Sequence, residues 1–342
     1  MRALVLTAYR ELSLTDVPDP QVGPHDVLVA VKACGVCGSD IHGFDGSTGR
    51  RQPPIIMGHE ASGQIAVVGT GVSDWHVGER VTFDSTVYCG VCETCAAGRP
   101  NLCPKREVIG VSCDEYRREG AFAEYLSVPS HLLHRLPENL SYEQAAMAEP
   151  VAVALHAVNR AHCRPGCSAV VFGAGLIGLL IVQALKLRGA GTVIAVDQDS
   201  GRLSLARTLG ADHTLEARED IVTCIRGIAG ADGADLAMEA VGIAATMQGA
   251  VRSVRKGATV CCVGNLVPEV ALPIQLVVTR ELDLFGCYGS AGEYGEAIAA
   301  IACRSIQVDP LLSAFGGLEE GPEWFQRLHH NRGGLLKVIL RP

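Results

Sequence analysis

Four cysteines gathered in one short stretch are the residues whose spacing most clearly suits chemistry in this chain. The run YCGVCETCAAGRPNLC contains two C-x-x-C steps that share a cysteine, and a fourth cysteine follows eight residues later. The four residues are Cys89, Cys92, Cys95 and Cys103. Zinc binds four thiolates at about 2.3 Å in closed structural sites. The run therefore predicts a structural zinc in a lobe spanning residues 88–104, with disulfides as the alternative.

A second set of potential ligands is spread over three segments outside this lobe. These ligands are Cys37 in CGVCGSDIHG, His59 and Glu60 in MGHEASG, and Glu149 in AEPVAVALHAV. A thiolate, an imidazole and a carboxylate can form an open zinc site that leaves one position for water or substrate. A histidine in a glycine-rich turn is more often a turn or core residue, so the spacing alone leaves both interpretations open.

A glycine-rich turn in the middle of the chain is typical of dinucleotide binding. The stretch GAGLIG supplies Gly173, Gly175, Leu176, Ile177 and Gly178, between an apolar strand pattern and an apolar helix pattern. The first glycine permits a tight turn, the second lets the backbone approach a pyrophosphate, and the third lets the helix pack on the strand. Free N–H groups at the helix start would face the phosphates. A purely structural glycine turn is the alternative.

Asp197 indicates which dinucleotide the turn would bind. It closes the second strand pattern, 19 residues after Gly178. A carboxylate at this position can accept hydrogen bonds from the adenosine ribose hydroxyls and would repel the extra phosphate of NADP, so we expect NAD. Arg202 could flank the adenosine, which leaves an opening for NADP, although a solvated helix residue is the simpler interpretation.

The elements that must position these residues change in character along the chain. Before residue 150, short branched runs alternate with Gly, Pro and Asp turns, which indicates a β-rich region. From about residue 169, strand patterns alternate with helix patterns, and Asp199 or Ser200 could cap the second helix. This alternation predicts an α/β fold with a doubly wound parallel sheet. The terminal LLKVIL reads as a strand that rejoins the first domain.

Composition and charge argue against several classes of function. The net charge is −8, from 29 basic and 37 acidic residues, which disfavours nucleic acid or an anionic membrane as a partner. The first apolar run is too short for a secretory signal, and no run reaches the roughly 18 residues of a membrane helix. With no such signal, the 14 cysteines favour a reducing cytoplasm, where thiols serve as ligands or core residues.

Several motifs, taken in order, resemble those of the zinc-dependent medium-chain alcohol and polyol dehydrogenases. The motifs are GHEASGQIAVVGTGV at residues 58–72, the cysteine lobe, GAFAEY at 120–125, the GAGLIG turn and the terminal GLLKVIL. The resemblance covers essentially the whole chain. It implies a split, β-rich GroES-like catalytic domain, formed by residues 1–151 and 289–342. A central NAD-binding Rossmann domain would comprise residues 152–288.

The same resemblance implies a ligand set for a catalytic zinc. Cys37, His59 and Glu60 would hold the ion. Glu149 stands where typical alcohol dehydrogenases of the family have a cysteine. With His156 downstream, that form is similar to the sorbitol dehydrogenase branch, in which the glutamate would bind directly or through water. A buried carboxylate paired with a nearby cation is the alternative for Glu149.

The resemblance also implies a path for the proton that the reaction releases. Ser39 would receive it from the substrate oxygen and pass it through a ribose hydroxyl of the cofactor to His42, whose pKa suits the task near neutral pH. A local turn hydrogen bond is the alternative for Ser39, and a surface turn residue is the alternative for His42. The candidate catalytic residues are therefore Ser39, His42, Glu60 and Glu149.

The implied reaction is the oxidation of a secondary alcohol to a ketone, dependent on NAD and zinc, with a polyol, sugar or sugar acid as substrate. A threonine-type amino-alcohol dehydrogenase and a simple alcohol dehydrogenase are the alternatives within the family, and a non-catalytic binding protein is the alternative from another class. Arg117 and Arg118 could bind a phosphate or carboxylate of the substrate, or belong to a solvated loop. The resemblance also implies a homo-oligomer, a tetramer or a dimer. The apolar stretch 271–289 could supply a contact between subunits or could equally be an internal strand.

Overall fold

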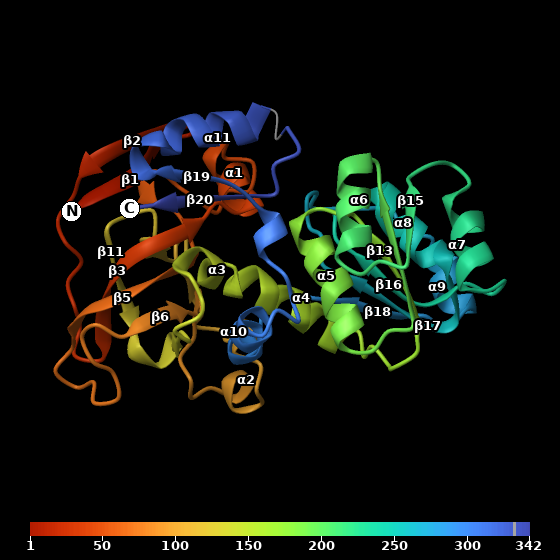
Figure 1. Ribbon diagram of the computed structural model, residues 1–342, viewed down its shortest axis with the longest axis horizontal. Helices are drawn as coiled ribbons and strands as arrows, with labels where there is room; N and C mark the ends of the chain where they lie inside the picture. The colour runs from red at the N-terminus through yellow and green to blue at the C-terminus, as the bar shows by residue number, and fades with distance from the viewer. Residues whose placement is uncertain (331–332) are drawn as a thin grey trace. The chain divides into compact units, whose positions relative to one another are not determined.

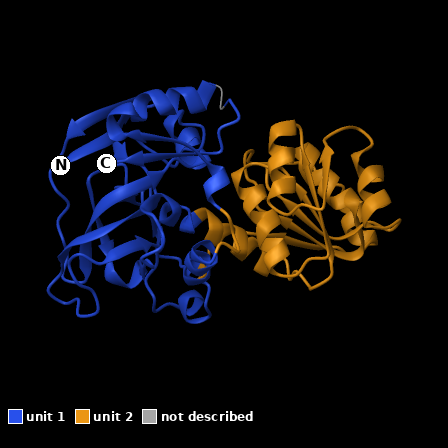
Figure 2. Ribbon diagram, viewed as in Figure 1, with its two compact units in different colours: residues 1–149, 294–303, 308–342 blue, residues 150–293, 304–307 orange. Residues whose placement is uncertain are grey.

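The structure is a computed structural model that describes residues 1–330 and 333–342. The chain forms two compact units, each considered by itself (Figure 2). Unit 1 comprises residues 1–149, 294–303 and 308–342, and unit 2 comprises residues 150–293 and 304–307.

Unit 1 is built on a seven-stranded sheet to which both ends of the chain contribute (Figure 1). Six strands follow the order β12-β6-β5-β3-β20-β19, and β11 pairs with β3. Their bounds are β3 Asp26–Gly35, β5 Glu60–Val68, β6 Arg80–Phe83, β11 Tyr125–Pro129, β12 Leu133–Arg135, β19 Leu312–Gly317 and β20 Lys337–Arg341. The predicted terminal strand is confirmed as β20, which runs antiparallel to β3.

Smaller elements complete unit 1. The remaining strands are β1 Arg2–Ala8, β2 Glu11–Asp16, β4 Ile55–Ile56, β7 Thr86–Val87, β8 Glu107–Val108, β9 Val111–Ser112 and β10 Arg117–Arg118. The α-helices are α1 Gly38–Phe44, α2 Glu93–Ala96, α3 Tyr142–Ala146, α10 Tyr294–Ala302 and α11 Gly321–His330. The 3-10 turns are η1 Pro100–Leu102, η2 Ser130–Leu132, η3 Asp309–Leu311 and η4 Leu318–Glu320. A core that includes Val29, Ile65 and Phe122 is completely or almost completely buried.

Unit 2 is a parallel six-stranded sheet with the order β15-β14-β13-β16-β17-β18. The strands are β13 Ser168–Phe172, β14 Thr192–Asp197, β15 His213–Glu216, β16 Ala234–Glu239, β17 Val254–Cys262 and β18 Asp283–Gly286. The helices are α5 Leu176–Leu187, α6 Ser200–Thr208, α7 Ile221–Ala229, α8 Ala244–Ser253 and α9 Ile274–Thr279, and α4 Ala148–Arg160 begins just before the unit boundary. This strand order, with its reversal between β13 and β16, is that of the Rossmann fold. The predicted α/β class is confirmed.

The central strands of unit 2 consist of apolar residues without alternation, which explains why they are buried. A parallel sheet covered by helices on both faces needs strands that are apolar throughout rather than alternating. Accordingly Val170, Ile194 and Val260 are completely buried in one core cluster. Asp199 proves to be the cap of α6, because its carboxylate accepts a hydrogen bond from the amide of Arg202 at 3.0 Å.

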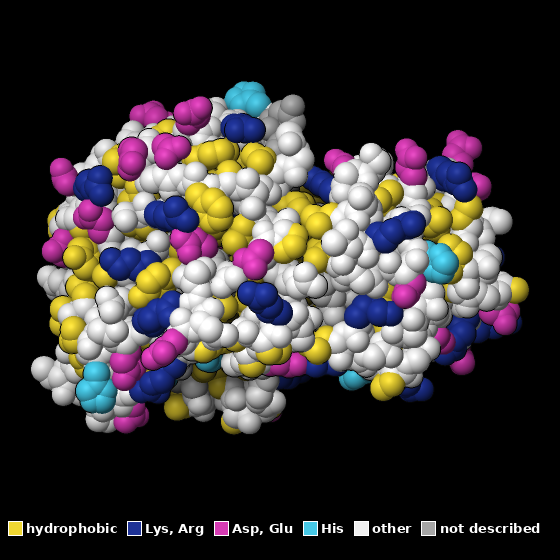
Figure 3. All heavy atoms as spheres, in the orientation of Figure 1, with side chains coloured by type: hydrophobic (Ala, Val, Ile, Leu, Met, Phe, Trp, Pro, Cys, Tyr) yellow, Lys and Arg dark blue, Asp and Glu magenta, His cyan; other side chains and the backbone are white. Residues whose placement is uncertain are grey.

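The surface mixes charges of both signs. Basic and acidic side chains are interspersed on the face of each unit drawn in Figure 3. Within the described residues, none of the helices has the length and apolar character needed to cross a membrane.

Candidate metal and coenzyme sites

The four cysteines of the lobe come together in one cluster. Their ligand atoms all lie within 4.8 Å of one another. The Sγ of Cys92 is 3.4 Å from that of Cys95 and 3.8 Å from that of Cys103, which in turn lies 3.6 Å from the Sγ of Cys89. Four thiolates at about 2.3 Å from a tetrahedral ion stand about 3.8 Å apart, so the spacing fits zinc. A sulfur–sulfur bond of about 2.05 Å would be far shorter.

Local structure explains how such a short segment closes around one ion. Cys92 directly precedes α2, which carries Cys95, and Cys103 ends the 3-10 turn η1. Hydrogen bonding from Thr94 lowers the pKa of Cys92 to about 6, which favours the thiolate form that binds metal. Among the described residues every cysteine is a free thiol.

A second cluster contains Cys37, His59 and Glu60, whose ligand atoms also lie within 4.8 Å of one another. The register of the sheet brings them together. Gly35 at the end of β3 is paired with Glu60 at the start of β5. Cys37 follows two residues later, as the N-cap of α1. A thiolate, an imidazole and a carboxylate form the donor set of an open zinc site, so the residues present fit this metal.

Asp40 lies next to this cluster and contacts His59. It has no assigned role in the sequence analysis. It is completely buried, and its Oδ1 lies 3.4 Å from Nδ1 of His59 and 3.4 Å from Nη2 of Arg51. Its Oδ2 accepts a hydrogen bond from the amide of Cys37 at 3.1 Å. Burial acts to raise the pKa of Asp40, but the charges of His59 and Arg51 outweigh it and lower that pKa to about 2. Asp40 is therefore an anion that fixes the orientation of His59.

Lys337 is the second supporting residue that sequence reasoning did not identify. It is buried on β20, and its ammonium forms an ion pair with the carboxylate of Glu60. The same ammonium donates to the carbonyl oxygen of Val36 at 3.1 Å. Burial acts to lower the pKa of Lys337, but the charge of Glu60, its hydrogen bond and the other nearby anionic groups together outweigh burial and raise that pKa. The signal in the sequence was the position of Lys337 directly before the apolar run VIL. A lysine in such a run is expected to be buried, and a buried lysine is rarely unpaired.

Glu149 does not belong to the compact group of three ligands. It is partly buried in the first turn of α4. Burial raises its pKa to about 7, and the charge of His59 acts in the opposite direction. His156, further along α4, pairs instead with Glu293 of unit 2, with 2.9 Å between its Nδ1 and Oε1 of the glutamate.

Ser39 and His42 both lie on α1, directly after Cys37. Ser39 is an exposed residue, and its Oγ accepts a hydrogen bond from Nη2 of Arg51 at 3.4 Å. His42 is half-buried in the last turn of the helix. Their role as a proton relay stays a prediction.

The glycine turn of unit 2 has the geometry expected of a dinucleotide site. Gly173 has φ +95°, and a Cβ added there would lie 2.5 Å from Val241. A Cβ at Gly178 would lie 1.7 Å from the carbonyl oxygen of Gly173. The helix and the glycine turn are therefore too close for any residue other than glycine at position 178. At Gly175 an added Cβ would meet no described atom within 4 Å, which leaves space for a ligand. Gly175 caps α5, whose first residues are Leu176 and Ile177.

Two carboxylates close the strands beside this turn. Asp197 ends β14, and its Oδ2 accepts a hydrogen bond from the amide of Ala174 at 2.6 Å. Glu239, which sequence reasoning missed, ends β16 and is buried. Its Oε1 accepts a hydrogen bond from the amide of Gly242 at 2.8 Å. Gly242 belongs to the loop that also contains Val241, the close neighbour of Gly173. A carboxylate closing the apolar run ADLAM was the available signal. Arg202 lies in the first turn of α6, and its contact with adenosine stays a prediction.

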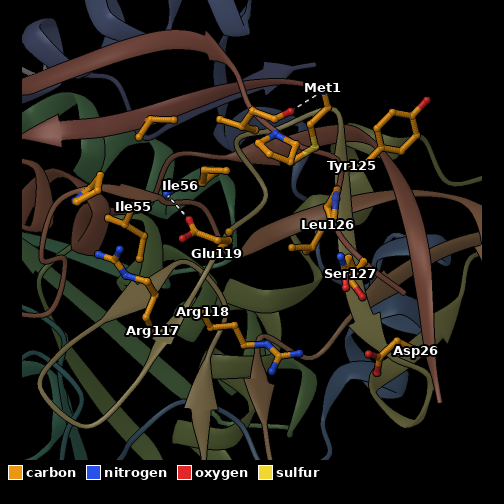
Figure 4. Close-up of a pocket in the computed structure, with 17 residues that line it drawn as sticks. Met1, Asp26, Ile55, Ile56, Arg117, Arg118, Glu119, Tyr125, Leu126 and Ser127 are labelled. Carbon is orange, nitrogen blue, oxygen red and sulfur yellow. Dashed lines mark hydrogen bonds between the residues drawn. The ribbon is translucent and has the colours of Figure 1, made fainter. Parts of the chain in front are cut away.

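Arg117 and Arg118 line a surface pocket of about 530 Å³ in unit 1, and their side chains point in different directions (Figure 4). Arg117 donates to the carbonyl oxygen of Gln52 at 2.8 Å, and Arg118 forms an ion pair with Glu107 at 2.9 Å. None of the three clustered metal ligands lines this pocket. The pocket is therefore distinct from the metal cluster, and the charge of Arg118 is already compensated.

Comparison with known proteins identifies the family. Residues 23–138 match the family Alcohol dehydrogenase GroES-like domain, and residues 177–302 match the family Zinc-binding dehydrogenase. Sorbitol dehydrogenase from Bacillus subtilis (strain 168) is 35% identical over 349 residues, which cover 100% of this chain and 97% of that protein.

Two solved structures share the fold over their whole length. An alcohol dehydrogenase from Thermus sp. ATN1 has a TM-score of 0.92 and 32% identity, and the match covers 100% of this chain and 99% of that one. Galactitol-1-phosphate dehydrogenase from Escherichia coli has a TM-score of 0.91 and 28% identity, with 100% of both chains covered. The family that the sequence motifs indicate is thus confirmed. The chain belongs to the family of zinc-dependent medium-chain alcohol and polyol dehydrogenases.

Proposed function

We propose that this protein oxidises a secondary alcohol group of a polyol, sugar or sugar acid to the ketone, with zinc and NAD. The observation that carries the proposal is the cluster of Cys37, His59 and Glu60 in a chain that also has a dinucleotide-type glycine turn. Unit 1 would be the catalytic zinc domain and unit 2 the NAD-binding domain. The four-cysteine lobe would hold a second, structural zinc.

The side chains around the cluster are suited to hold and tune the metal. When bound, zinc polarises the substrate hydroxyl and lowers its pKa toward neutrality. Asp40 orients His59, and Lys337 compensates the charge of Glu60 and limits its movement. Glu149, with a pKa raised to about 7, is available to accept or return a proton near neutral pH or to join the ligands.

The proton of the substrate hydroxyl needs a route to water. Ser39 follows Cys37 by two residues, and it is an exposed residue. We assign it the first step of a relay that continues through a ribose hydroxyl of the cofactor to His42. Arg51 contributes by donating to Ser39, which leaves the serine's own hydrogen free to point elsewhere.

The coenzyme proposed is NAD rather than NADP. Asp197 is held in place by the amides of Ala174 and Asp199, at 2.6 and 3.0 Å. An anchored carboxylate at the end of the second strand accepts bonds from ribose hydroxyls and repels a phosphate attached there. Arg202 would lie against the adenosine.

The substrate class is supported by two relatives whose names specify polyols. The Bacillus protein is a sorbitol dehydrogenase, and the Escherichia protein is a galactitol-1-phosphate dehydrogenase. A carboxylate among the metal ligands and a second one at Glu149 suit a substrate with several hydroxyl groups, because vicinal hydroxyls can donate to them.

We also propose that the chain forms a homo-oligomer through the edge of the unit 2 sheet. The strand β18 is an edge strand, and α9, which precedes it in the chain, exposes Ile274 and Val278 to solvent by 65% and 68%. Exposed apolar side chains next to a sheet edge are typical of an association surface. Light scattering of the purified protein tests this, and a monomer at all concentrations would contradict it.

The reaction is tested by following NADH absorbance with zinc-loaded protein, NAD and a panel of polyols, polyol phosphates, sugar acids, threonine and simple alcohols. Turnover of one stereochemical set of vicinal diols would support the proposal. Turnover of threonine alone would move the assignment to the amino-alcohol dehydrogenases. No turnover across the panel, with NAD bound, would contradict the proposal.

A further inference from the structure

Two cysteines of unit 2 lie close together although the proposed dehydrogenase reaction uses neither. Cys163 follows the end of α4, and Cys167 directly precedes β13. Their Sγ atoms are 3.6 Å apart, and both residues are partly exposed. A disulfide needs the sulfurs to approach to about 2.05 Å, so this separation must shorten by about 1.5 Å.

Hydrogen bonds to the neighbouring loop hold the backbone of this turn. The amide of Gly166 donates to the carbonyl oxygen of Gly189 at 2.7 Å, and the carbonyl oxygen of Cys167 accepts from the amide of Gly191 at 2.8 Å. His162 adopts φ +53°, which is uncommon for a residue with a side chain. These contacts hold the backbone of the turn on which the two sulfurs lie 3.6 Å apart.

The other cysteine pair in unit 2 differs in one decisive respect. Cys261 interacts with Cys287, but Cys261 is completely buried, so an oxidant in solution cannot reach it. The lobe cysteines are committed to the zinc cluster. Among the described residues, Cys163 and Cys167 combine proximity with access to solvent.

We propose that Cys163 and Cys167 form a redox-active dithiol that closes to a disulfide on reaction with hydrogen peroxide. The Cys167 thiolate attacks one peroxide oxygen, which gives a sulfenic acid and, after protonation, one water. The Cys163 sulfur then attacks the Cys167 sulfur, loses its proton and releases the hydroxyl as a second water. Two thiols are oxidised by two electrons and one peroxide is reduced, and a thiol reductant restores the starting state.

The electrostatics of the pair support this order of events. A hydrogen bond from Cys163 lowers the pKa of Cys167 to about 7 and raises that of Cys163. Arg188, which lowers the pKa of Cys163, and Asp235, which raises that of Cys167, act against this order, but the hydrogen bond is the largest influence on both thiols. Cys167 is thus the thiolate near neutral pH, and Cys163 is the resolving thiol.

The sequence allows a direct test by mass spectrometry. Trypsin should release residues 161–186 as one peptide, because the Arg164–Pro165 bond resists cleavage, and that peptide contains only these two cysteines. The zinc-loaded protein would be treated with peroxide below the dose that releases zinc, then alkylated and digested. We expect a peptide that is lighter by two hydrogens and carries no alkyl group, and prior reduction should restore two alkyl groups. A peptide that stays doubly alkylated, or that carries sulfinic acid without a disulfide, would overturn the proposal.

Variants distinguish the attacking thiol from the resolving thiol. In Cys163→Ser, a sulfenic acid should accumulate at Cys167 and be trapped by dimedone. In Cys167→Ser, trapping at Cys163 should be at least several-fold slower. Cys224→Ser is the matched control, because Cys224 lies in the same unit beside Arg218 and Asp220, and it should form the disulfide as the natural chain does. Equal trapping in the two variants would overturn the assignment of Cys167. None of these measurements depends on dehydrogenase activity.

Discussion

Lys337 and Glu60 form a buried ion pair in unit 1 although 277 residues separate them in the sequence. The last strand of the chain thereby places a cation against a residue that we assign as a metal ligand. The strand β20 can do so because it runs beside β3, the strand that leads to Cys37. The metal cluster therefore depends on both ends of the chain.

Replacing the lysine should leave the Glu60 carboxylate buried without its partner. We expect Lys337→Met to lower the free energy of unfolding by about 3–5 kcal/mol, the usual cost of removing one member of a buried pair. Urea unfolding measures this, with Lys32→Met on the exposed side of β3 as the control. A loss no larger than that of the control would show that the pair is not important for stability.

Asp40 should control zinc affinity without binding zinc itself. Because it orients His59, Asp40→Asn is expected to weaken zinc binding by about 10- to 100-fold, as is typical of residues that support a metal ligand. Competition with a chelator measures the Kd. Asp45→Asn is the control, because Asp45 pairs with His329 and not with the cluster. An unchanged Kd in Asp40→Asn would contradict the role proposed for this residue.

The His156–Glu293 pair should make the stability of unit 2 depend on pH. Hydrogen bonding to Glu293 raises the pKa of His156 above its usual 6.5. Burial acts to raise the pKa of Glu293, but the hydrogen bond and charge of His156, together with backbone hydrogen bonds, outweigh burial, so that pKa lies below its usual 4.5.

The sign follows from these directions. His156 contributes its full stabilisation below pH 6.5, and this stabilisation is lost as the pH rises through the higher pKa that His156 has in the folded protein. Glu293 contributes its stabilisation above pH 4.5. We therefore expect His156→Gln to lower the Tm more at about pH 5.5 than at about pH 8. Exposed His213→Gln is the control. An equal loss at both values would argue against an ionic pair.

Asp197 should decide between the two coenzymes. In Asp197→Asn the charge that repels a 2′-phosphate is lost while a hydrogen-bond acceptor remains. We expect the ratio of kcat/KM for NAD to that for NADP to fall by about 10-fold or more, since a hydrogen bond to a charged group is worth about 1.5–3 kcal/mol. Steady-state kinetics with both coenzymes measures it. Asp199→Asn, which alters only the cap of α6, should keep the ratio, and an unchanged ratio in Asp197→Asn would refute the assignment.

Ser39 should be needed for turnover but not for zinc. Ser39→Ala is expected to lower kcat by about 100-fold or more, because a positioned proton-transfer group contributes about 10²–10⁴-fold. Zinc content and NAD affinity should stay unchanged, and Ser47→Ala on the loop after α1 serves as the control. A variant that keeps most of its kcat would exclude Ser39 from the proton path.

The features that the sequence predicted well are local ones. The cysteine lobe and the glycine turn each lie within about one helical turn or one loop. The spacing of their residues in the sequence therefore predicts their arrangement in space. The Rossmann sheet was predictable because a fully buried parallel strand must be apolar throughout, as in AVVF and VIAV.

The features that it did not reveal depend on strand pairing between distant segments. Lys337 meets Glu60 only because β20 lies beside β3, and no local pattern states that pairing. Asp40 was visible beside Cys37, but its role follows from burial against His59 and Arg51, which the sequence does not specify. Tyr294 is likewise buried by a distant segment, and its hydroxyl accepts a hydrogen bond from the amide of Ser85 at 3.2 Å.

The central claim, that Cys37, His59 and Glu60 hold a zinc needed for alcohol oxidation, is tested most directly by comparing zinc content and NADH formation in the natural chain and in Cys37→Ser. The two ligand clusters predict two zinc ions per chain and polyol-dependent NADH formation for the natural chain. For Cys37→Ser we predict that only the lobe zinc remains, with NAD binding intact and NADH formation lost. A variant that keeps both zinc ions and forms NADH at the natural rate would contradict the account.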